Sequence, residues 1–333
     1  MADPNSSYSE LMAATIDSRS EEIADDFSVS TALLYRLKQK GKQRFWKGGI
    51  NITQALAYQK NQSFKWISGY EKADITPSDV FTLASYAPKQ GVISVSISVL
   101  EQLQNSGKEA MFDLLEERID NGFTSIMQEV GLAMYSDGTG SGGKQIGGLN
   151  HLIPSDPTTG TVGGINRALW SFWQPQLYDF SGGGLQTGGA ITASSTTIQA
   201  AMNTMYLNTM RPGGKDSVDL IAADNTYYGY YWASLQGNQR FTNSKMAEAG
   251  FENIRFMGAD VVPDGGLSGG IDANTMFFLN TNYLFWRPHV NANFVSADPA
   301  TRYSTDQLAL VKLIHVAGNM TCSNSKLQGR IQA

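Results

Sequence analysis

The sequence contains almost no cysteine, no long apolar run and no excess of basic residues. Cys322 is the single cysteine among 333 residues, so no disulfide can form within one chain, and we expect a reducing compartment. No stretch of about 18 apolar residues occurs, so the sequence predicts no membrane-spanning helix. The formal net charge of -5 argues against attraction of the whole molecule to nucleic acid.

Signals for secretion and for metal binding are also missing. The first 27 residues are polar and acidic, without the basic start and apolar run of a signal peptide, so we expect no secretion. There are three histidines, and none has another histidine, a cysteine or an acidic residue at metal-ligand spacing. The sequence therefore predicts no metal site at His151, His289 or His315.

Two glycine-rich stretches imitate enzyme motifs. Residues 138–144 spell G-x-x-x-x-G-K, but Gln145 replaces the hydroxyl residue that would hold magnesium, and the stretch follows a predicted helix instead of a strand. It predicts a helix end and a mobile loop. Residues 266–270 match G-x-S-x-G around Ser268, but turn residues flank them, so a catalytic serine is not expected.

Carboxylates and aromatics supply two further candidates. Tyr227, Tyr228, Tyr230, Tyr231 and Trp232 could stack bases or sugars, but at helical spacing they favour packing. A carboxylate pair for glycoside hydrolysis could come from the polar side of one predicted helix, although a solvated helix face is commoner. The acidic residues concerned are Asp113, Glu116, Glu117 and Asp120.

Hydrophobic periodicity organises the first half of the chain. Residues 50–59 and 63–70 predict two strands of a hairpin-like excursion that runs to about residue 86. Such a ribbon has little core of its own, so another surface must cover it. Residues 92–99 predict a strand with alternating isoleucine or valine and serine, and residues 107–135 predict a long amphipathic helix.

The second half predicts a mixture of helices and strands. After an irregular stretch to about residue 190, the pattern predicts a helix from near residue 195 and an aromatic helix in 225–238. Strands are expected at 217–224, twice within 274–287, and in an alternating stretch over 313–331. The order of elements is that of an α+β protein.

One segment near the N-terminus is strongly basic. Residues 31–47 contain six basic residues and no acidic one. Two interpretations stay open: a solvated arm, or an extended arm that lies on an acidic neighbour.

The order of elements resembles the major capsid proteins of tailed bacteriophages, which have the Hong Kong 97-type fold. The likeness covers nearly the whole chain and depends on the combination of segments. The segments are the arm ending in Gly48-Gly49, "APKQGVISVSISVLEQLQNSGKEAMFDLLEERI", "MYSDGTGSGGKQIGGLNHLIP", "STTIQAAMNTMYL", "VDLIAADNTYYGYY", "FMGADVVPDGGL" and "LALVKLIHVAGNMTCSNSKLQGRI".

The resemblance implies a division of the chain. It would comprise an N-terminal arm (1–48), an extended β-hairpin loop (49–90), a peripheral domain with a spine helix at 107–135 (91–194), an axial domain (195–274) and strands returning to the peripheral domain (275–333).

The resemblance also implies a function. Many copies would assemble as hexamers and pentamers of an icosahedral phage head around double-stranded DNA, without sequence-specific DNA contact and without a membrane. Scaffolding, portal and decoration proteins are the implied partners. The implied location is the virion capsid, assembled in the host cytoplasm. No catalytic residue, cofactor or metal is implied.

Two elements would make the contacts between subunits. The arm would reach neighbouring copies, and the hairpin would lie over an adjacent one. The implied contact residues are Arg36, Lys38, Lys40, Arg44, Phe64, Trp66, Tyr70, Glu71 and Lys72.

Three alternatives stay open. An encapsulin-like shell protein shares the fold. A carboxylate-based hydrolase would act as a monomer and lose activity when one or two acidic residues are replaced. A glycan-binding or host-binding module is suggested by the aromatic content of 11%. An electron micrograph of the purified protein would separate these classes.

Overall fold

The computed structural model describes residues 32–72, 75–76, 78–100, 108–211, 216–235, 254–265, 269–296, 302–303 and 309–333. The acidic N-terminal stretch and the turn expected at Ser268 lie outside these ranges. The side chains of Asp113, Glu116 and Glu117 lie outside the description as well.

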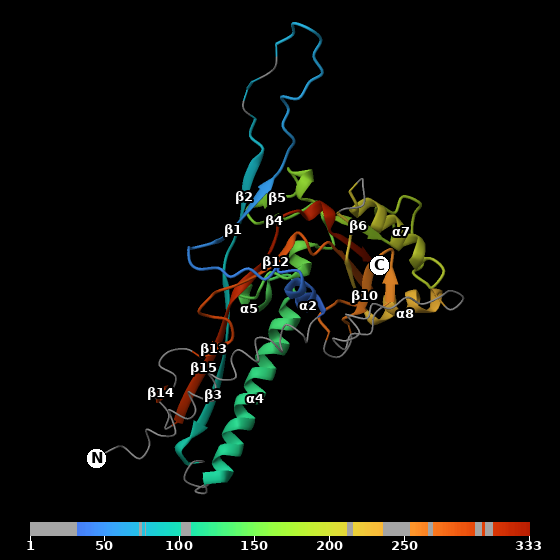
Figure 1. Ribbon diagram of the computed structural model, residues 1–333. Coiled ribbons are helices and arrows are strands. Elements are labelled where there is room, and N and C mark those ends of the chain that lie inside the picture. Colours follow the sequence, from blue (N-terminus) through green and yellow to red (C-terminus); the bar gives the residue numbers. More distant parts are fainter. Residues whose placement is uncertain are drawn as a thin grey trace.

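Two sheets form the body of the protein (Figure 1). The five-stranded sheet contains β3 (Lys89–Ser98), β12 (Leu284–Pro288), β13 (Val295–Ser296), β14 (Arg302–Tyr303) and β15 (Ala309–Cys322). The seven-stranded sheet has the order β7 (Gly183–Gly184), β6 (Gln176–Asp179), β16 (Gly329–Gln332), β11 (Thr275–Leu279), β8 (Leu220–Ala223), β10 (Ala259–Pro263) and β9 (Ile254–Phe256). Two ribbons pair β1 (Ile52–Ala57) with β2 (Phe81–Tyr86), and β4 (Thr161–Val162) with β5 (Ile165–Asn166). The mixture confirms the expected α+β class.

The long ribbon of β3 and β15 carries the spine of the molecule. The two strands pair antiparallel from Ala309 opposite Ser98 to Gly318 opposite Lys89. Helix α4 (Lys108–Ala133) runs alongside this ribbon (Figure 1), which confirms the predicted strand and the predicted long helix. At Gly122, a Cβ atom would stand 2.9 Å from Val95 Cγ2, so the absence of a side chain permits this close approach.

The seven-stranded sheet has its own apolar core. Every residue of β8 and of β11 is buried, because helices α7 (Ile198–Thr209) and α8 (Asn225–Ser234) pack against this part of the molecule. Tyr227 and Tyr231 lie in that core. The expected packing role of the aromatic helix is therefore confirmed for these two residues, whereas Trp232 stays 39% exposed.

The last part of the chain joins the two sheets. The sequence predicted one alternating strand over 313–331, but β15 ends at Cys322 and a 3₁₀ turn, η2 (Ser325–Leu327), separates it from β16. Strand β16 lies between β6 and β11 in the seven-stranded sheet. Strands β11 and β16 both lie inside the segment 275–333, which was expected to return to the peripheral domain. They belong to the seven-stranded sheet, whereas β15 of the same segment belongs to the five-stranded sheet. The irregular stretch before residue 190 also contains β6, which was not predicted.

The segment after α4 folds back onto the helix end through residues 146–152, which follow the glycine-rich stretch 138–144. It contains two single turns, α5 (Gly140–Gly143) and α6 (Leu149–Leu152). The backbone N–H of Leu149 donates to the Met134 carbonyl at 2.7 Å. Leu149 and Leu152 are buried, as are the flanking residues 146–148. Carbonyls left unsatisfied at the helix end therefore find donors in this segment.

Gly148 tests this docking directly. A Cβ atom there would overlap the carbonyl oxygens of Ala133 and Met134, so Gly148→Ala is expected to lower the free energy of unfolding by about 1–3 kcal/mol. Denaturant unfolding would measure the change. Gly229→Ala is the matched control, because Gly229 lies in α8 with open space around it and alanine there should stabilise by about 0.5–1 kcal/mol. Equal effects of the two variants would contradict the docking.

Candidate assembly interface

The hairpin of β1 and β2 ends in a long loop. The strands pair antiparallel from Ile52 opposite Tyr86 to Ala57 opposite Phe81. Between them, the described part of residues 58–80 contains no helix and no strand, so the strand predicted at 63–70 was wrong. Local polar bonds replace a strand ladder there: the Asn61 side chain accepts from the backbone N–H and hydroxyl of Ser63 and from the hydroxyl of Ser78.

This loop carries exposed aromatic side chains. Figure 1 shows it projecting beyond the rest of the body. Phe64 is 73% exposed and Trp66 90% exposed, and their rings meet edge to face with centroids 5.4 Å apart. The other predicted contact residues of the hairpin, Tyr70, Glu71 and Lys72, are exposed as well. Uncovered apolar surface of this kind marks an interaction site.

The ribbon below the loop adds a further apolar face. One side of β2 buries Ala84 and Tyr86, whereas Phe81 and Leu83 on the other side are 77% and 63% exposed. Opposite them, Ala57 and Ala55 are exposed too. Sequence reasoning missed these residues, although the alternation in "FTLASY" predicts two apolar faces and hence an unsatisfied one.

The basic segment 31–47 was expected to be either a solvated arm or an extended arm, and its described part is not wholly one or the other. Its first part forms helix α2 (Ala32–Gln39). Leu33, Leu34 and Leu37 are buried in the core beneath it, and their helical spacing explains the conformation. Only the residues that follow run as an extended strand-like stretch along β12, where the N–H groups of Arg44 and Trp46 donate to the carbonyls of Trp286 and Pro288 at 2.9 and 2.8 Å.

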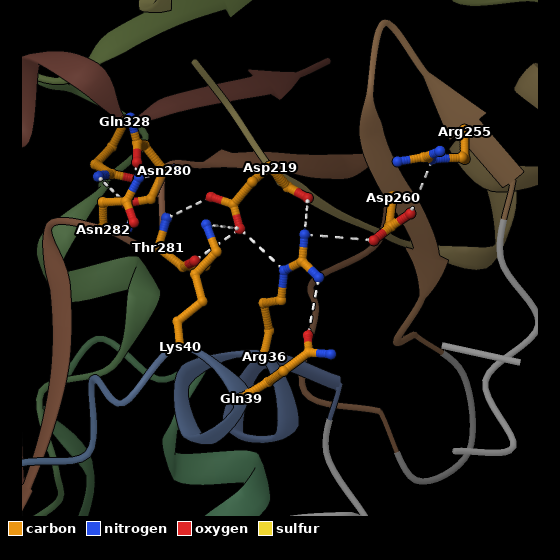
Figure 2. Close-up of polar contacts among 10 residues, drawn as sticks. All are labelled: Arg36, Gln39, Lys40, Asp219, Arg255, Asp260, Asn280, Thr281, Asn282 and Gln328. Carbon is orange, nitrogen blue, oxygen red and sulfur yellow. Dashed lines mark hydrogen bonds and ion pairs between the residues drawn. The ribbon is translucent and has the colours of Figure 1, made fainter. Parts of the chain in front are cut away.

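Ion pairs fix α2 to the seven-stranded sheet (Figure 2). Arg36 Nε and Lys40 Nζ each lie 3.0 Å from Asp219 Oδ2. Asp219 also accepts hydrogen bonds from the backbone N–H and the hydroxyl of Thr281, both at 2.7 Å. Arg36 Nη2 lies 3.5 Å from Asp260, a carboxylate with no exposed surface. Two of the predicted contact residues, Arg36 and Lys40, therefore have partners within their own chain.

The other two predicted contact residues of this segment, Lys38 and Arg44, have exposed side chains. Arg44 lies against the ring of Phe285, with its guanidinium carbon 4.8 Å from the centroid. The basic segment thus has one side that faces the sheet and another side on which Lys38 and Arg44 are exposed to solvent.

A polar pocket lies where α4 ends near the seven-stranded sheet. It has a volume of ≈ 720 Å³, and its lining includes Tyr135, Asn150, Asp272 and Arg330. Asn150 donates to Asp272 at 2.8 Å and accepts from Arg330 at 2.7 Å. These hydrogen bonds stabilise the wall of the pocket, although Nε of Arg330 is buried without a hydrogen-bond partner. The groups do not form a nucleophile with its base.

Two buried ionisable groups near this pocket, Tyr135 and Asp264, contact each other. Tyr135 Oη donates a hydrogen bond to Asp264, and burial raises the pKa of both groups. Burial likewise raises the pKa of Cys322 to about 12, and a buried thiol that stays protonated is unreactive. In the described ranges, no group of three or more histidine, cysteine or acidic side chains could hold a metal ion. None of the helices described is both long enough and apolar enough to cross a membrane.

His151 gives the structure a pH dependence. Burial, followed by the positive charge of Arg167, lowers the pKa of His151 below its ordinary value of 6.5. The unfolded chain therefore binds a proton at higher pH than the folded protein, so His151 should destabilise the fold progressively as the pH falls from about 7 towards about 5. We expect the melting temperature to fall less over this range in His151→Gln, measured by thermal unfolding at each pH. Parallel curves for the two proteins would contradict the assignment.

Comparison with known proteins places the fold. No family model matches the chain, and no curated protein sequence matches it. Solved structures do match. The "Cyanophage A-1(L) capsid asymmetric unit" has 16% identity and a TM-score of 0.61, and the match covers 87% of this chain and 88% of that one. The "Capsid of native GTA particle" has 9% identity and a TM-score of 0.54, with 89% of each chain covered.

A third match points in the same direction. The "Satellite phage P4 procapsid including size determination (Sid) protein" has 10% identity and a TM-score of 0.50, and the match covers 94% of this chain and 90% of that chain. Identities this low establish shared architecture alone. Over almost its whole length, therefore, this chain has the fold of phage capsid proteins.

Proposed function

We propose that the protein is the major capsid protein of a tailed phage, a structural subunit without catalytic activity. Its copies would assemble as hexamers and pentamers into an icosahedral head that encloses double-stranded DNA. The fold supports a capsid subunit. The observation that carries the proposal further is the projecting hairpin loop, whose aromatic side chains have no partner among the described residues of their own chain beyond each other.

The hairpin would connect neighbouring subunits. Phe64, Trp66 and Tyr70 expose most of their surface in the single chain, and burying a large aromatic side chain stabilises by about 1.5–3 kcal/mol. A hairpin that lies over the next copy around a ring is a heterologous contact, and such contacts close into rings when the rotation between copies permits. Glu71 and Lys72 at the same loop would set the register through charge, as would Lys38 and Arg44 of the basic segment.

The domain division follows from the same proposal. The arm would span 1–48, the extended loop 49–90, the peripheral domain 91–194, the axial domain 195–274, and the returning strands 275–333. The five-stranded sheet with α4 supports a peripheral domain, and the seven-stranded sheet with α7 and α8 supports an axial one. Because β11 and β16 pair with β8 and β6, the axial sheet would include part of the returning segment.

Partners and location complete the proposal. Scaffolding, portal and decoration proteins would join the shell, and packaged DNA would lie inside it without sequence-specific contact. Assembly would take place in the host cytoplasm. The net charge of -5 means that the subunit as a whole does not attract DNA, which supports contact without sequence specificity.

Electron microscopy tests the proposal. The protein would be expressed alone and together with a candidate scaffolding protein, and both preparations would be imaged after purification. We expect capsomer rings, tubes or closed shells, at least in the co-expressed sample. A compact monomer in both preparations, with a hydrolytic activity that disappears when an acidic residue is replaced, would favour the enzyme alternative.

A further inference from the structure

Basic side chains gather on one face of a short parallel strand pair. The stretch that follows α2 runs beside β12, with Gln43 opposite Trp286. Successive side chains of a strand point to opposite faces, so the residues that flank this pair share the other face. These flanking residues are Lys42, Arg44, Phe285 and Arg287. We call the three basic residues among them, Lys42, Arg44 and Arg287, the cation cluster.

The cation cluster surrounds a single aromatic ring. Lys42 Nζ lies 5.5 Å, Arg44 Cζ 4.8 Å and Arg287 Cζ 5.7 Å from the centroid of the Phe285 ring. The Phe285 side chain is only 5% exposed. Attraction of cations to the face of an aromatic ring holds the three positive charges close together.

No carboxylate in the described ranges pairs with the cation cluster. Asp219 is the acidic group whose charge acts on Lys42, and it is already paired with Arg36 and Lys40. Burial, then the charges of Arg44 and Lys40, lower the pKa of Lys42. The positive charges of the cluster thus repel one another, and a bound anion would relieve that repulsion.

Arg287 also has an unused hydrogen-bond donor. Its Nε is buried without a hydrogen-bond partner, and its Nη2 donates to the neutral side chain of Gln54 at 2.7 Å. A buried donor left unpaired costs free energy, so an acceptor at this position is favoured. Gln54 lies in β1, and Arg287 therefore links β12 to the base of the hairpin.

We propose that the cation cluster binds a phosphate group. Arg44 and Arg287 each present a planar fork of N–H donors, which matches the oxygens of a phosphate, and Lys42 adds a compact charge. The bound phosphate would join three parts of the chain that are far apart in sequence: the stretch after α2, β12 and, through Arg287 and Gln54, strand β1. Its binding would therefore hold the base of the hairpin to the body of the subunit.

A phosphate group can come from two sources, inorganic phosphate in solution or the backbone of a nucleic acid. The chemistry recognised is the same in both. The inference concerns a single subunit and is tested on unassembled protein, so it can fail while the proposed shell holds, and it can hold while the shell fails.

Phosphorus NMR tests the site with inorganic phosphate as the probe. The phosphate signal would be recorded as the unassembled full chain is added, at an ionic strength held constant with sodium chloride. We expect saturable broadening, and we expect Arg44→Gln to weaken the binding by about tenfold or more, because a charge-assisted donor is lost. The control Lys144→Gln removes the same charge at an exposed position elsewhere and should bind as the parent does. Absence of saturable binding, or equal weakening by the two variants, would overturn the proposal.

Thermal unfolding gives a second readout. A ligand that binds the folded state alone raises the melting temperature by mass action, so phosphate should stabilise the parent and Lys144→Gln more than it stabilises Arg44→Gln. The general effect of phosphate on protein surfaces acts on all three proteins alike, and the difference between them isolates the site. Equal shifts in all three would contradict a phosphate site at the cation cluster.

A short oligodeoxythymidylate distinguishes the two sources. If it displaces inorganic phosphate from the subunit, and if Arg44→Gln lowers the salt dependence of its binding by about 0.7 in the logarithmic slope, the cation cluster accepts a nucleic-acid backbone. If it leaves bound phosphate in place, the ligand is the free ion. Displacement that is as strong in Arg44→Gln as in the parent would show that the phosphate lies elsewhere and would overturn the assignment.

Discussion

Replacing Phe64 and Trp66 together by alanine is expected to abolish shell assembly and to leave the stability of the single subunit unchanged. Both side chains project into solvent, at 73% and 90% exposure, and each packs mainly on the other. Their loss removes little from the folded chain. At an interface between copies, aromatic anchors of this kind contribute about 2 kcal/mol or more each. Two such losses at every contact weaken each one by roughly a thousandfold.

Two measurements separate assembly from folding in this variant. Sedimentation velocity or electron microscopy would report particles, and denaturant unfolding of the unassembled subunit would report stability. The control Phe64→Tyr/Trp66→Phe keeps two aromatic rings and should keep assembly. If the alanine variant forms shells as readily as the parent, the hairpin tip is no subunit contact. If instead it unfolds at lower denaturant, the loop packs on its own chain and the proposed role fails.

Among single substitutions near the protein surface, removal of the Asp219 carboxylate should cause the largest loss in the free energy of unfolding of the subunit. In Asp219→Ala, Arg36 and Lys40 lose their shared partner, and the backbone N–H and hydroxyl of Thr281 lose theirs. The side chain is only 14% exposed, so the cations left behind are poorly hydrated. We expect a loss of about 3–5 kcal/mol in the free energy of unfolding, the usual cost of breaking a buried ion pair by deleting one partner.

The reference for this variant is Glu129→Ala on the exposed side of α4. That change should stay within about 0.5 kcal/mol, because exposed charges contribute little. A double variant, Arg36→Ala/Asp219→Ala, should lose less than the sum of its single variants, because the two side chains share one interaction. If the losses of the two single variants add exactly in the double variant, the ion pairs of Arg36 with Asp219 do not hold α2 to the sheet.

Periodic patterns predicted the spine of the molecule well. The alternation in residues 92–99 and the long apolar stripe that follows became β3 and α4 almost at the predicted bounds. Both depend on local periodicity, which a single sequence displays directly. The aromatic helix was equally readable, because Tyr227 and Tyr231 are four residues apart and so share one face, which the core buries.

The failures have distinct physical causes. Helix α2 was missed because its charges suggested a solvated arm, although Leu33, Leu34 and Leu37 mark an apolar stripe that the core covers. Its ion pair with Asp219 joins residues 183 positions apart, and no local pattern encodes such a pairing. The hairpin strand was misplaced because "SFKWISGY" alternates like a strand, whereas its apolar side chains have no sheet to lie on and remain in solvent.

The placement of β16 has a consequence for the order of folding. This strand, Gly329–Gln332, fills the gap between β6 and β11, so the sheet cannot close before residues 329–332 have left the ribosome. A nascent chain would hold β6 and β7 apart from β11 until then. Completion of this sheet therefore waits for a strand that is synthesised after all the other strands with which it forms the sheet.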